Sequence, residues 1–127
     1  MKLEFFEDGS EGGPLILLYG GGPEEVALLR KAVRALAEGA GRRLAVHNLP
    51  FVQSVGNCRL NAISAESDVG VVAAAKASEF EWALDPESWL QTDELLEPFC
   101  GKQGGVAFQY LNRVRGPAII YSMDRAW

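Results

Sequence analysis

The chain has 127 residues, of which 48% are hydrophobic and 23% charged, and its formal net charge is −5. This length suits one hydrophobic core without a disulfide or metal staple, so we expect residues 1–127 to form a single domain. The acidic balance opposes binding to nucleic acids, whose phosphates require clusters of Lys and Arg. The longest apolar run, near residues 15–19, is far shorter than the roughly 20 residues that cross a bilayer, so no membrane association is expected.

The first residues and the cysteines together predict a cytoplasmic location. Residues 1–8 contain acidic side chains where a secretory signal peptide carries a long apolar segment. Cys58 and Cys100 fit free thiols in a reducing compartment. A disulfide between them is an alternative that a chain of this size does not need.

Two strands are predicted at the start of the chain. Residues 2–6 fit a short first strand, and residues 10–14, which include two glycines and a proline, fit a turn. Residues 14–19 form an unbroken apolar run. Because such runs are typical of strands covered on both faces, this strand is expected at the centre of the sheet.

A helix is predicted from Pro23 to about residue 38. Proline suits the first helical position, and the helix dipole favours the carboxylates of Glu24 and Glu25 in the first turn. Spacings of three and four residues place on one helical stripe the apolar side chains of Val26, Leu29, Val33 and Leu36. Gly39 is expected to end the helix.

The middle of the chain alternates between apolar and polar residues, as strands do. Strands are predicted over residues 43–49, 57–64 and 79–84, because successive side chains in each alternate between two faces. Residues 69–75 are rich in alanine and fit either a strand or a helical turn. Their valines favour a strand.

A second helix is predicted to begin at Asp85, which caps it, with Pro86 at the first helical position. Its core side chains are predicted to be Trp89, Leu95, Leu96 and Phe99. Its water-facing side chains are predicted to be Gln91, Asp93, Glu94 and Glu97. Pro98 ends the helix, and strands over 106–110 and 117–123 are then expected to form a hairpin.

These elements predict an α+β fold with a mostly antiparallel sheet and two helices that cover one of its faces. The short connections between residues 43 and 84 favour antiparallel pairing. The strand–helix–strand segment over residues 14–64, followed by the second helix, can be drawn as a ferredoxin-like split βαβ unit with extra strands.

His47 and Cys58 are the candidate catalytic residues. They lie on consecutive predicted strands, and if those strands pair, the two side chains become cross-strand neighbours. A Cys–His pair can generate a thiolate nucleophile. The alternative is structural, because Cys58 shares its strand face with Leu60 and Ala62 and then belongs to the core.

Two features could bind a small anion. The first is the glycine turn 20–22 before the first helix, where phosphate is often held. Its spacing fits no phosphate-binding motif, and the glutamates that follow would repel an anion, so we interpret it as a structural corner. The second is a basic group formed by Arg42 and Arg43, with Arg59 expected nearby, which could bind an anion or an acidic partner.

The acidic side chains and the possible metal ligands give weaker signals. Glu79 and Glu81 share one strand face and could perform acid–base chemistry, but a solvated strand face has the same pattern. One histidine and two cysteines at distant positions fit no ligand-spacing motif, so neither a metal nor a cofactor is predicted.

Trp127, the last residue of the sequence, is a candidate interface residue. Tryptophan combines a large apolar ring with a hydrogen-bond donor and is enriched at interfaces, so a two-fold homodimer is expected. The sequence names no function. Its default interpretation is a small non-catalytic interaction or ligand-binding module with a protein or small-molecule partner, and the alternatives are an enzyme centred on His47 and Cys58 or an anion-binding regulator.

Overall fold

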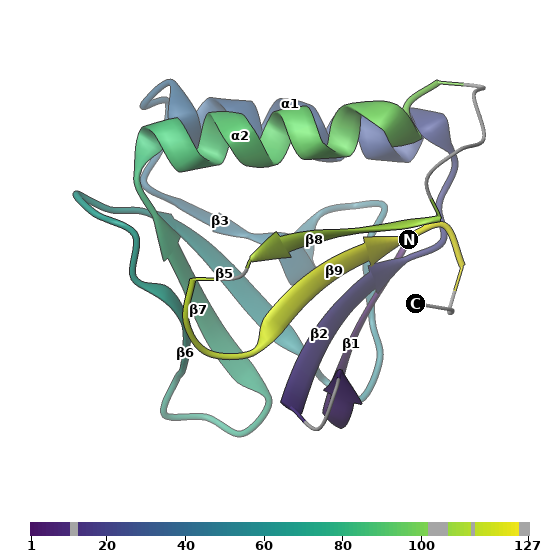
Figure 1. Cartoon of the computed structure of the whole chain (residues 1–127), viewed down its shortest axis with the longest axis vertical. Coiled ribbons are helices and arrows are strands. Elements are labelled where there is room, and N and C mark those ends of the chain that lie inside the picture. Colours follow the sequence, from purple (N-terminus) through teal and green to yellow (C-terminus); the bar gives the residue numbers. More distant parts are fainter. Residues whose placement is uncertain (11–12, 102–106, 113, 125–127) are drawn as a thin grey trace.

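The computed structural model describes residues 1–10, 13–101, 107–112 and 114–124, in which the chain forms nine strands, two α-helices and two 3₁₀ turns (Figure 1). The first half contains β1 (Lys2–Ser10), β2 (Gly13–Tyr19), α1 (Pro23–Ala37), β3 (Arg43–Ala45), η1 (Val46–Asn48), β4 (Gln53–Ser54) and β5 (Arg59–Ser64). The second half contains β6 (Gly70–Ala73), β7 (Glu79–Leu84), α2 (Pro86–Leu96), η2 (Glu97–Phe99), β8 (Phe108–Asn112) and β9 (Ala118–Ser122).

The strands form two mixed sheets, with the orders β4-β1-β2-β9-β8 in sheet A and β3-β5-β7-β6 in sheet B. The pairs β1–β4, β2–β9 and β5–β7 are parallel, and the others are antiparallel. The α+β class is therefore confirmed. The mostly antiparallel single sheet and the ferredoxin-like arrangement are not confirmed, because the strands divide between two sheets and three of the pairs run parallel.

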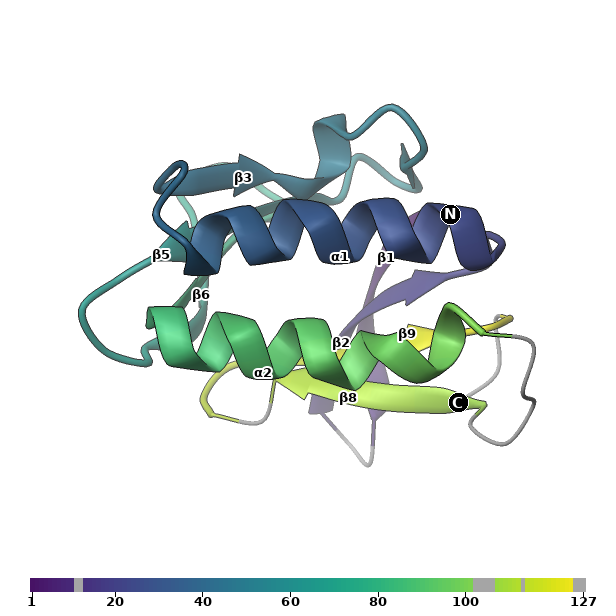
Figure 2. The same ribbon diagram turned by 90° about the horizontal axis from the view of Figure 1, so that it is seen from above.

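The two helices lie side by side as one layer above the sheets (Figure 2). The main core gathers apolar side chains from both helices and both sheets. Trp82 of β7 and Trp89 of α2 meet in this core with their ring centroids 4.7 Å apart, and the Trp89 Nε1–H donates to the Ile63 carbonyl oxygen at 3.0 Å. One shared core thus holds the helix layer on both sheets.

Strand β2 is buried on both faces, which confirms the interpretation of its unbroken apolar run. Ile16 and Leu18 point into the main core below the helices. Leu15 and Leu17 point to the opposite face of sheet A, where they form a second buried cluster with Ile120 of β9. The strand lies in the middle of sheet A, between β1 and β9, as a two-sided apolar run requires.

Helix α1 begins and packs as its sequence predicts. Pro23 occupies the first turn, and the stripe that starts at Val26 and ends at Leu36 is buried in the main core. Gly39 follows the helix with a φ of +80°, a left-handed conformation that glycine adopts without a steric penalty.

The strand predicted over residues 43–49 is shorter in the structure. It ends at Ala45, and the chain then turns out of sheet B through η1. Residues 70–73 do form a strand, β6, and the alternating burial of β7 matches its sequence pattern. The Asp85 side chain accepts a hydrogen bond from the Ser88 N–H at 2.9 Å, so the predicted cap of α2 is confirmed.

The prediction that Asp93 faces water is wrong. Its side chain is only 2% exposed and lies between the two helices. Arg30 Nε donates to Asp93 Oδ1 at 2.9 Å, and Arg34 Nη2 donates to Oδ2 at 2.6 Å. A carboxylate leaves water when two guanidinium groups satisfy it, and this ion triad ties α1 to α2.

The two sheets also meet at the hairpin that joins β8 to β9. The Val71 N–H of β6 donates to the Arg115 carbonyl oxygen at 2.8 Å. The next residue, Gly116, has a φ of +83°, and a Cβ atom there would overlap the Val71 carbonyl oxygen. The backbone of sheet B therefore approaches the β8–β9 hairpin so closely that only glycine fits.

Candidate functional site

The His47 ring completes the hydrogen bonding of sheet B. The β3–β5 register pairs Leu44 with Ala62 and Ala45 with Asn61, so its next partners would be residues 46 and 60. The chain leaves the sheet at residue 46, and His47 Nδ1 lies instead 3.1 Å from the Leu60 amide nitrogen and 3.3 Å from the Leu60 carbonyl oxygen. The ring thus takes the place of the backbone partner that Leu60 lacks where β3 ends.

Cys58 lies in the main core and is 1% exposed. Burial, with a smaller contribution from the charge of Glu4, raises the pKa of its thiol to about 12. A thiol with this pKa is protonated at neutral pH, whereas nucleophilic attack requires the thiolate. The geometry of Cys58 and His47 therefore fits a structural role for each side chain.

Thiol modification tests this assignment. In the Cys100→Ser variant, whose only thiol is Cys58, we expect native protein at pH 7.5 to react with iodoacetamide at least about 100-fold more slowly than denaturant-unfolded protein, because the thiol is buried and protonated. In the Cys58→Ser variant, the half-buried Cys100 is expected to react in the native state. Rapid native-state modification of Cys58 would instead identify an activated thiolate.

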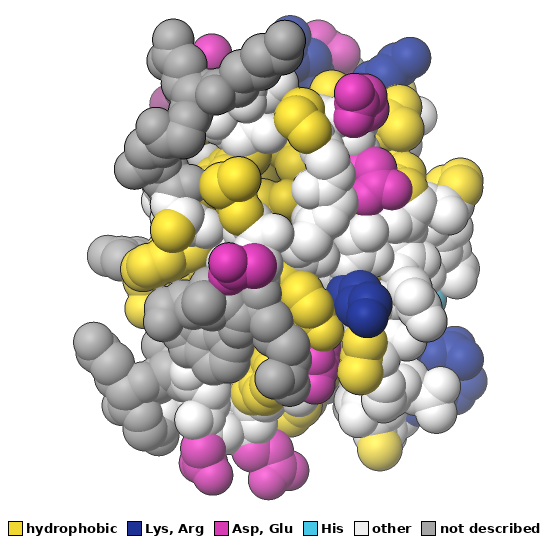
Figure 3. All heavy atoms as spheres, turned by 90° about the vertical axis from the view of Figure 1, so that its right-hand side faces the viewer, with side chains coloured by type: hydrophobic (Ala, Val, Ile, Leu, Met, Phe, Trp, Pro, Cys, Tyr) yellow, Lys and Arg dark blue, Asp and Glu magenta, His cyan; other side chains and the backbone are white. Residues whose placement is uncertain are grey.

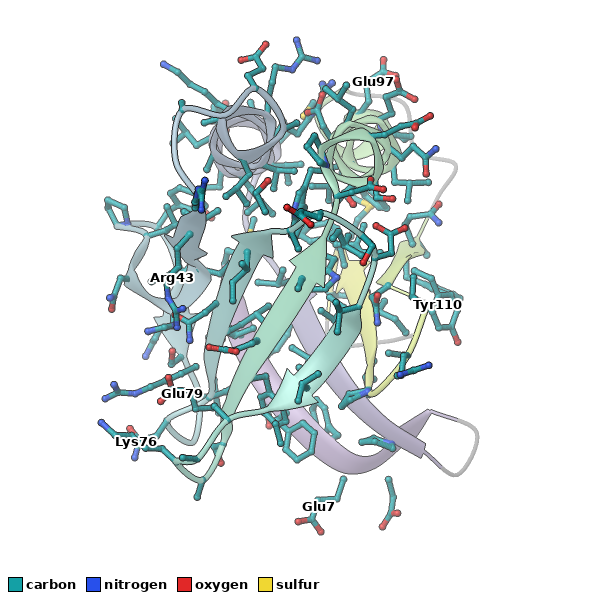
Figure 4. All side chains as sticks on the ribbon, turned by 90° about the vertical axis from the view of Figure 1, so that its left-hand side faces the viewer. Glu7, Arg43, Lys76, Glu79, Glu97 and Tyr110 are labelled. Atoms are coloured by element: carbon teal, nitrogen blue, oxygen red, sulfur yellow. The ribbon has the colours of Figure 1, made fainter. Side chains whose placement is uncertain are left out.

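The arginines predicted to bind an anion do not form one cluster. Arg43 pairs with Ile63 in the β3–β5 register, so Arg59, at the other end of β5, lies about 13 Å away along the strand. Arg43 Nη2 donates to Glu81 Oε2 at 3.3 Å, and Arg59 pairs with Glu79 in the β5–β7 register. Figure 4, which looks along the helices, shows Arg43 and Glu79 on one flank of the molecule and Tyr110 on the opposite flank.

Arg42 lies in different surroundings, beside a hollow of about 490 Å³ that Ser64 and Glu66 also line. Arg43 forms an ion pair with Glu81, Arg42 lines the same hollow as Glu66, and Arg59 is the register partner of Glu79. Because both members of the Arg43–Glu81 ion pair are about half exposed, the pair contributes little stability, at most about 1 kcal/mol.

The glycine turn is a corner held from the neighbouring strand. The Tyr121 hydroxyl donates to the Gly20 carbonyl oxygen at 2.7 Å, and the Gly20 N–H donates to the Ser122 carbonyl oxygen at 3.2 Å. Glu25 Oε1 accepts from the Met1 amino group at 3.0 Å, so a carboxylate already occupies this end of α1. These contacts support a structural role for the turn.

Two further sequence predictions concern metals and Trp127. Within the described ranges, no three His, Cys, Asp or Glu side chains form a group that could hold a metal ion. Trp127 lies outside the described residues, so its proposed role at an interface stays a prediction.

A groove along α1 is the site that sequence reasoning missed. It consists of two adjoining hollows of about 660 and 300 Å³, which share Ala32 and Ala35 as lining residues. The larger hollow is lined by Glu25, Leu28, Lys31, Ala32, Ala35, Leu49, Pro50 and Phe51. The smaller hollow is lined by Ala32, Ala35, Leu36, Ala40, Gly41, Arg43 and Leu44. We call the two together the α1 groove.

The α1 groove forms because the helix carries a second stripe beside its core stripe. Leu28, Ala32 and Ala35 are separated by four and three residues and therefore share one helix face. The alanines leave a hollow, and Leu28 is 51% exposed at its rim. The facing wall is the apolar segment 49–51, which follows η1 and contains the exposed Pro50.

The charges around the α1 groove are mainly positive. Lys31 is exposed on α1, and Arg43 lies at the start of β3 on the far wall. Among the described lining residues only Glu25 is acidic, and it is paired with the Met1 amino group, which also donates to the Phe51 carbonyl oxygen at 3.2 Å. An apolar groove with a cationic rim thus lies on a chain whose net charge is −5.

One end of the molecule carries side chains of mixed character. On the side where α1 begins and α2 ends, hydrophobic side chains lie interspersed with acidic and basic ones (Figure 3). On the described part of the chain, no helix has both the length and the apolar character that a membrane span requires.

Comparisons with known proteins give no further guide, since no family model, curated protein or solved structure matches the chain. The candidate site therefore rests on its own geometry.

Proposed function

We propose that the protein is a non-catalytic binding module whose α1 groove receives apolar side chains of a partner protein. The observation that carries this proposal is the exposed Leu28 at the rim of a hollow of about 660 Å³, opposite the apolar segment 49–51. Pockets that bind ligands have volumes of this order and combine an apolar lining with a few polar groups.

The shape of the groove favours a polypeptide segment over a compact small molecule. The lining residues Glu25 to Ala35 alone extend about 15 Å along the helix axis, and the smaller hollow continues past the helix end to Gly41. An elongated apolar groove suits a polypeptide segment that inserts several of its side chains one after another along the groove.

An enzyme centred on His47 and Cys58, or an anion-binding regulator that uses Arg42, Arg43 and Arg59, is less well supported. The first would need a thiolate from a buried thiol whose pKa is about 12. The second would need the three arginines to meet, whereas Arg59 lies about 13 Å from Arg43 along the strand and Arg42 lines a separate hollow. The homodimer and the cytoplasmic location stay predictions.

Peptide selection tests the proposal. Random 12-residue peptides displayed on phage are selected on the immobilised protein, and the affinities of recovered peptides are then measured for two variants. Leu28→Glu places a charge at the groove rim and is expected to weaken binding at least about tenfold. Leu90→Glu is the matched control, because Leu90 is similarly exposed, at 42%, but lies on α2 outside the groove.

Circular dichroism should show both variants folded. Recovery of no binding peptide, or equal affinity of the two variants, would contradict the proposed function.

A further inference from the structure

Among the residues that the structure describes, no strand pairs with one edge of sheet B, which lies beside the α1 groove. Strand β3 is the terminal strand of that sheet, next to β5. The opposite edge strand, β6, is partly covered, because its Val71 N–H donates to the Arg115 carbonyl oxygen. Arg43 and Leu44 of β3 instead line the smaller, 300 Å³ hollow of the groove.

The hydrogen-bond pattern shows which β3 groups face outward. The Ser64 N–H donates to the Arg42 carbonyl oxygen at 2.9 Å, and antiparallel pairs alternate between bonded and non-bonded positions. Leu44 therefore pairs with β5 through its backbone, whereas the N–H and C=O of Arg43 and the N–H of Ala45 point away from it. An edge of this kind is a template for an added strand.

The side chains beside this edge define what an added strand would contain. A residue next to Leu44 would point to the same side as Leu44, toward the Ala32 and Ala35 wall, where an apolar side chain fits. Its neighbours in the strand would point to the opposite side, beside the Arg43 side chain. The ion pair of Arg43 with Glu81 is half exposed and weak, and the guanidinium has further N–H groups that can donate to a second carboxylate. Because the rest of the chain is acidic, an acidic segment is attracted here and repelled elsewhere.

We propose, on the basis of the proposed function, that the partner is an extended segment of alternating acidic and apolar residues that adds to sheet B as a strand beside β3. Its backbone pairs with Arg43 and Ala45, its apolar side chains enter the α1 groove, and its carboxylates lie on the other side of the strand, beside the Arg43 side chain. Main-chain pairing supplies affinity in this mode, and the side-chain pockets supply specificity.

The probe is a fluorescein-labelled decapeptide of alternating glutamate and valine, measured by fluorescence anisotropy. We expect it to bind at least about tenfold more tightly than the isomer in which lysine replaces glutamate. Arg43→Glu is expected to weaken binding of the glutamate peptide at least tenfold. Arg59→Glu is the matched control, because this exposed arginine lies on the same sheet but away from the edge and the groove.

Backbone methylation tests the strand pairing itself. One methylated peptide carries N-methyl groups on its glutamates and the other on its valines. Successive N–H groups of a strand point to opposite edges, so only one of the two modifications removes the hydrogen bonds to β3. We expect one methylated peptide to lose binding and the other to retain it.

The outcomes separate this inference from the proposed function. Equal binding of the two methylated peptides would overturn strand addition. Strand addition would also be overturned if the glutamate–valine peptide did not bind at millimolar concentration while phage-selected peptides bound in a Leu28-dependent way. In both cases groove binding would stand. If no peptide of either origin binds, both proposals fail. Light scattering that shows a dimer abolished by Leu28→Glu would identify a second copy of the chain as the occupant and would overturn this inference.

Discussion

Replacement of Asp93 by alanine is expected to lower the free energy of unfolding by about 2–3 kcal/mol. The carboxylate is 2% exposed and accepts hydrogen bonds from Arg30 and Arg34, which lie one turn apart on α1. Its removal leaves two guanidinium groups without their shared acceptor at the contact between the helices. The loss stays below that of a fully buried pair because Arg34 is half exposed and regains water.

Chemical denaturation of the variant measures this loss, and Glu94→Ala is the matched control because Glu94 is the exposed neighbouring acid on the same helix. The control is expected to change stability by less than about 0.5 kcal/mol. Equal stability of the two variants would show that the ion triad does not hold α1 on α2.

The same carboxylate gives the stability a defined pH dependence. Burial by itself would raise the pKa of Asp93, but the hydrogen bonds and charges of Arg34 and Arg30 outweigh it and hold the pKa below the ordinary value. A group whose pKa is lower in the folded state stabilises the fold above its unfolded pKa, about 3.9 for Asp, and loses this contribution as the pH falls through the folded value. The stability difference between wild type and Asp93→Asn should therefore be constant at neutral pH and shrink on acidification below about pH 4.

Gly116→Ala is expected to destabilise the protein by about 3 kcal/mol. Two costs combine at this position. The φ of +83° is unfavourable for alanine, and the added Cβ would overlap the Val71 carbonyl oxygen, which belongs to the backbone of β6 and cannot rotate away. The substitution should therefore separate the β8–β9 hairpin from sheet B.

Gly56→Ala isolates the first of these costs. Gly56 has a similar φ of +63°, but a Cβ atom there would meet nothing within 4 Å. We expect this control to cost only about 1 kcal/mol. Thermal unfolding of both variants gives the comparison, and equal destabilisation would mean that the approach of the hairpin to Val71 contributes nothing.

Local sequence signals predicted the elements but not their partners. Pro23, Asp85 and Gly39 mark helix ends because their conformational and capping preferences act within a few residues. Pairing is different, because alternation tells which side chains share a face and not which strand lies beside it. The parallel β2–β9 pair joins strands from opposite ends of the chain, and no local pattern in either strand indicates it.

The same limit explains the misplacement of Asp93 and the missed groove. An acidic residue on a helix is usually solvated, and only the approach of α1 brings two arginines to this one. The α1 groove combines Leu28, Ala32 and Ala35 with a segment that folds back from beyond η1. The available sequence signal was Leu28, an apolar residue beside the core stripe of the helix. Nothing in the sequence indicated that the segment 49–51 would lie opposite it.

The most direct test of the central claim is a nuclear magnetic resonance titration of the ¹⁵N-labelled protein with a phage-selected peptide. The α1 groove predicts that the amide signals of Leu28, Ala32, Ala35 and Phe51 shift most at saturation, while the signal of Leu90 on α2 stays in place. Shifts confined to α2 or to the outer face of sheet B around Glu79 and Glu81 would contradict the assignment of the binding site.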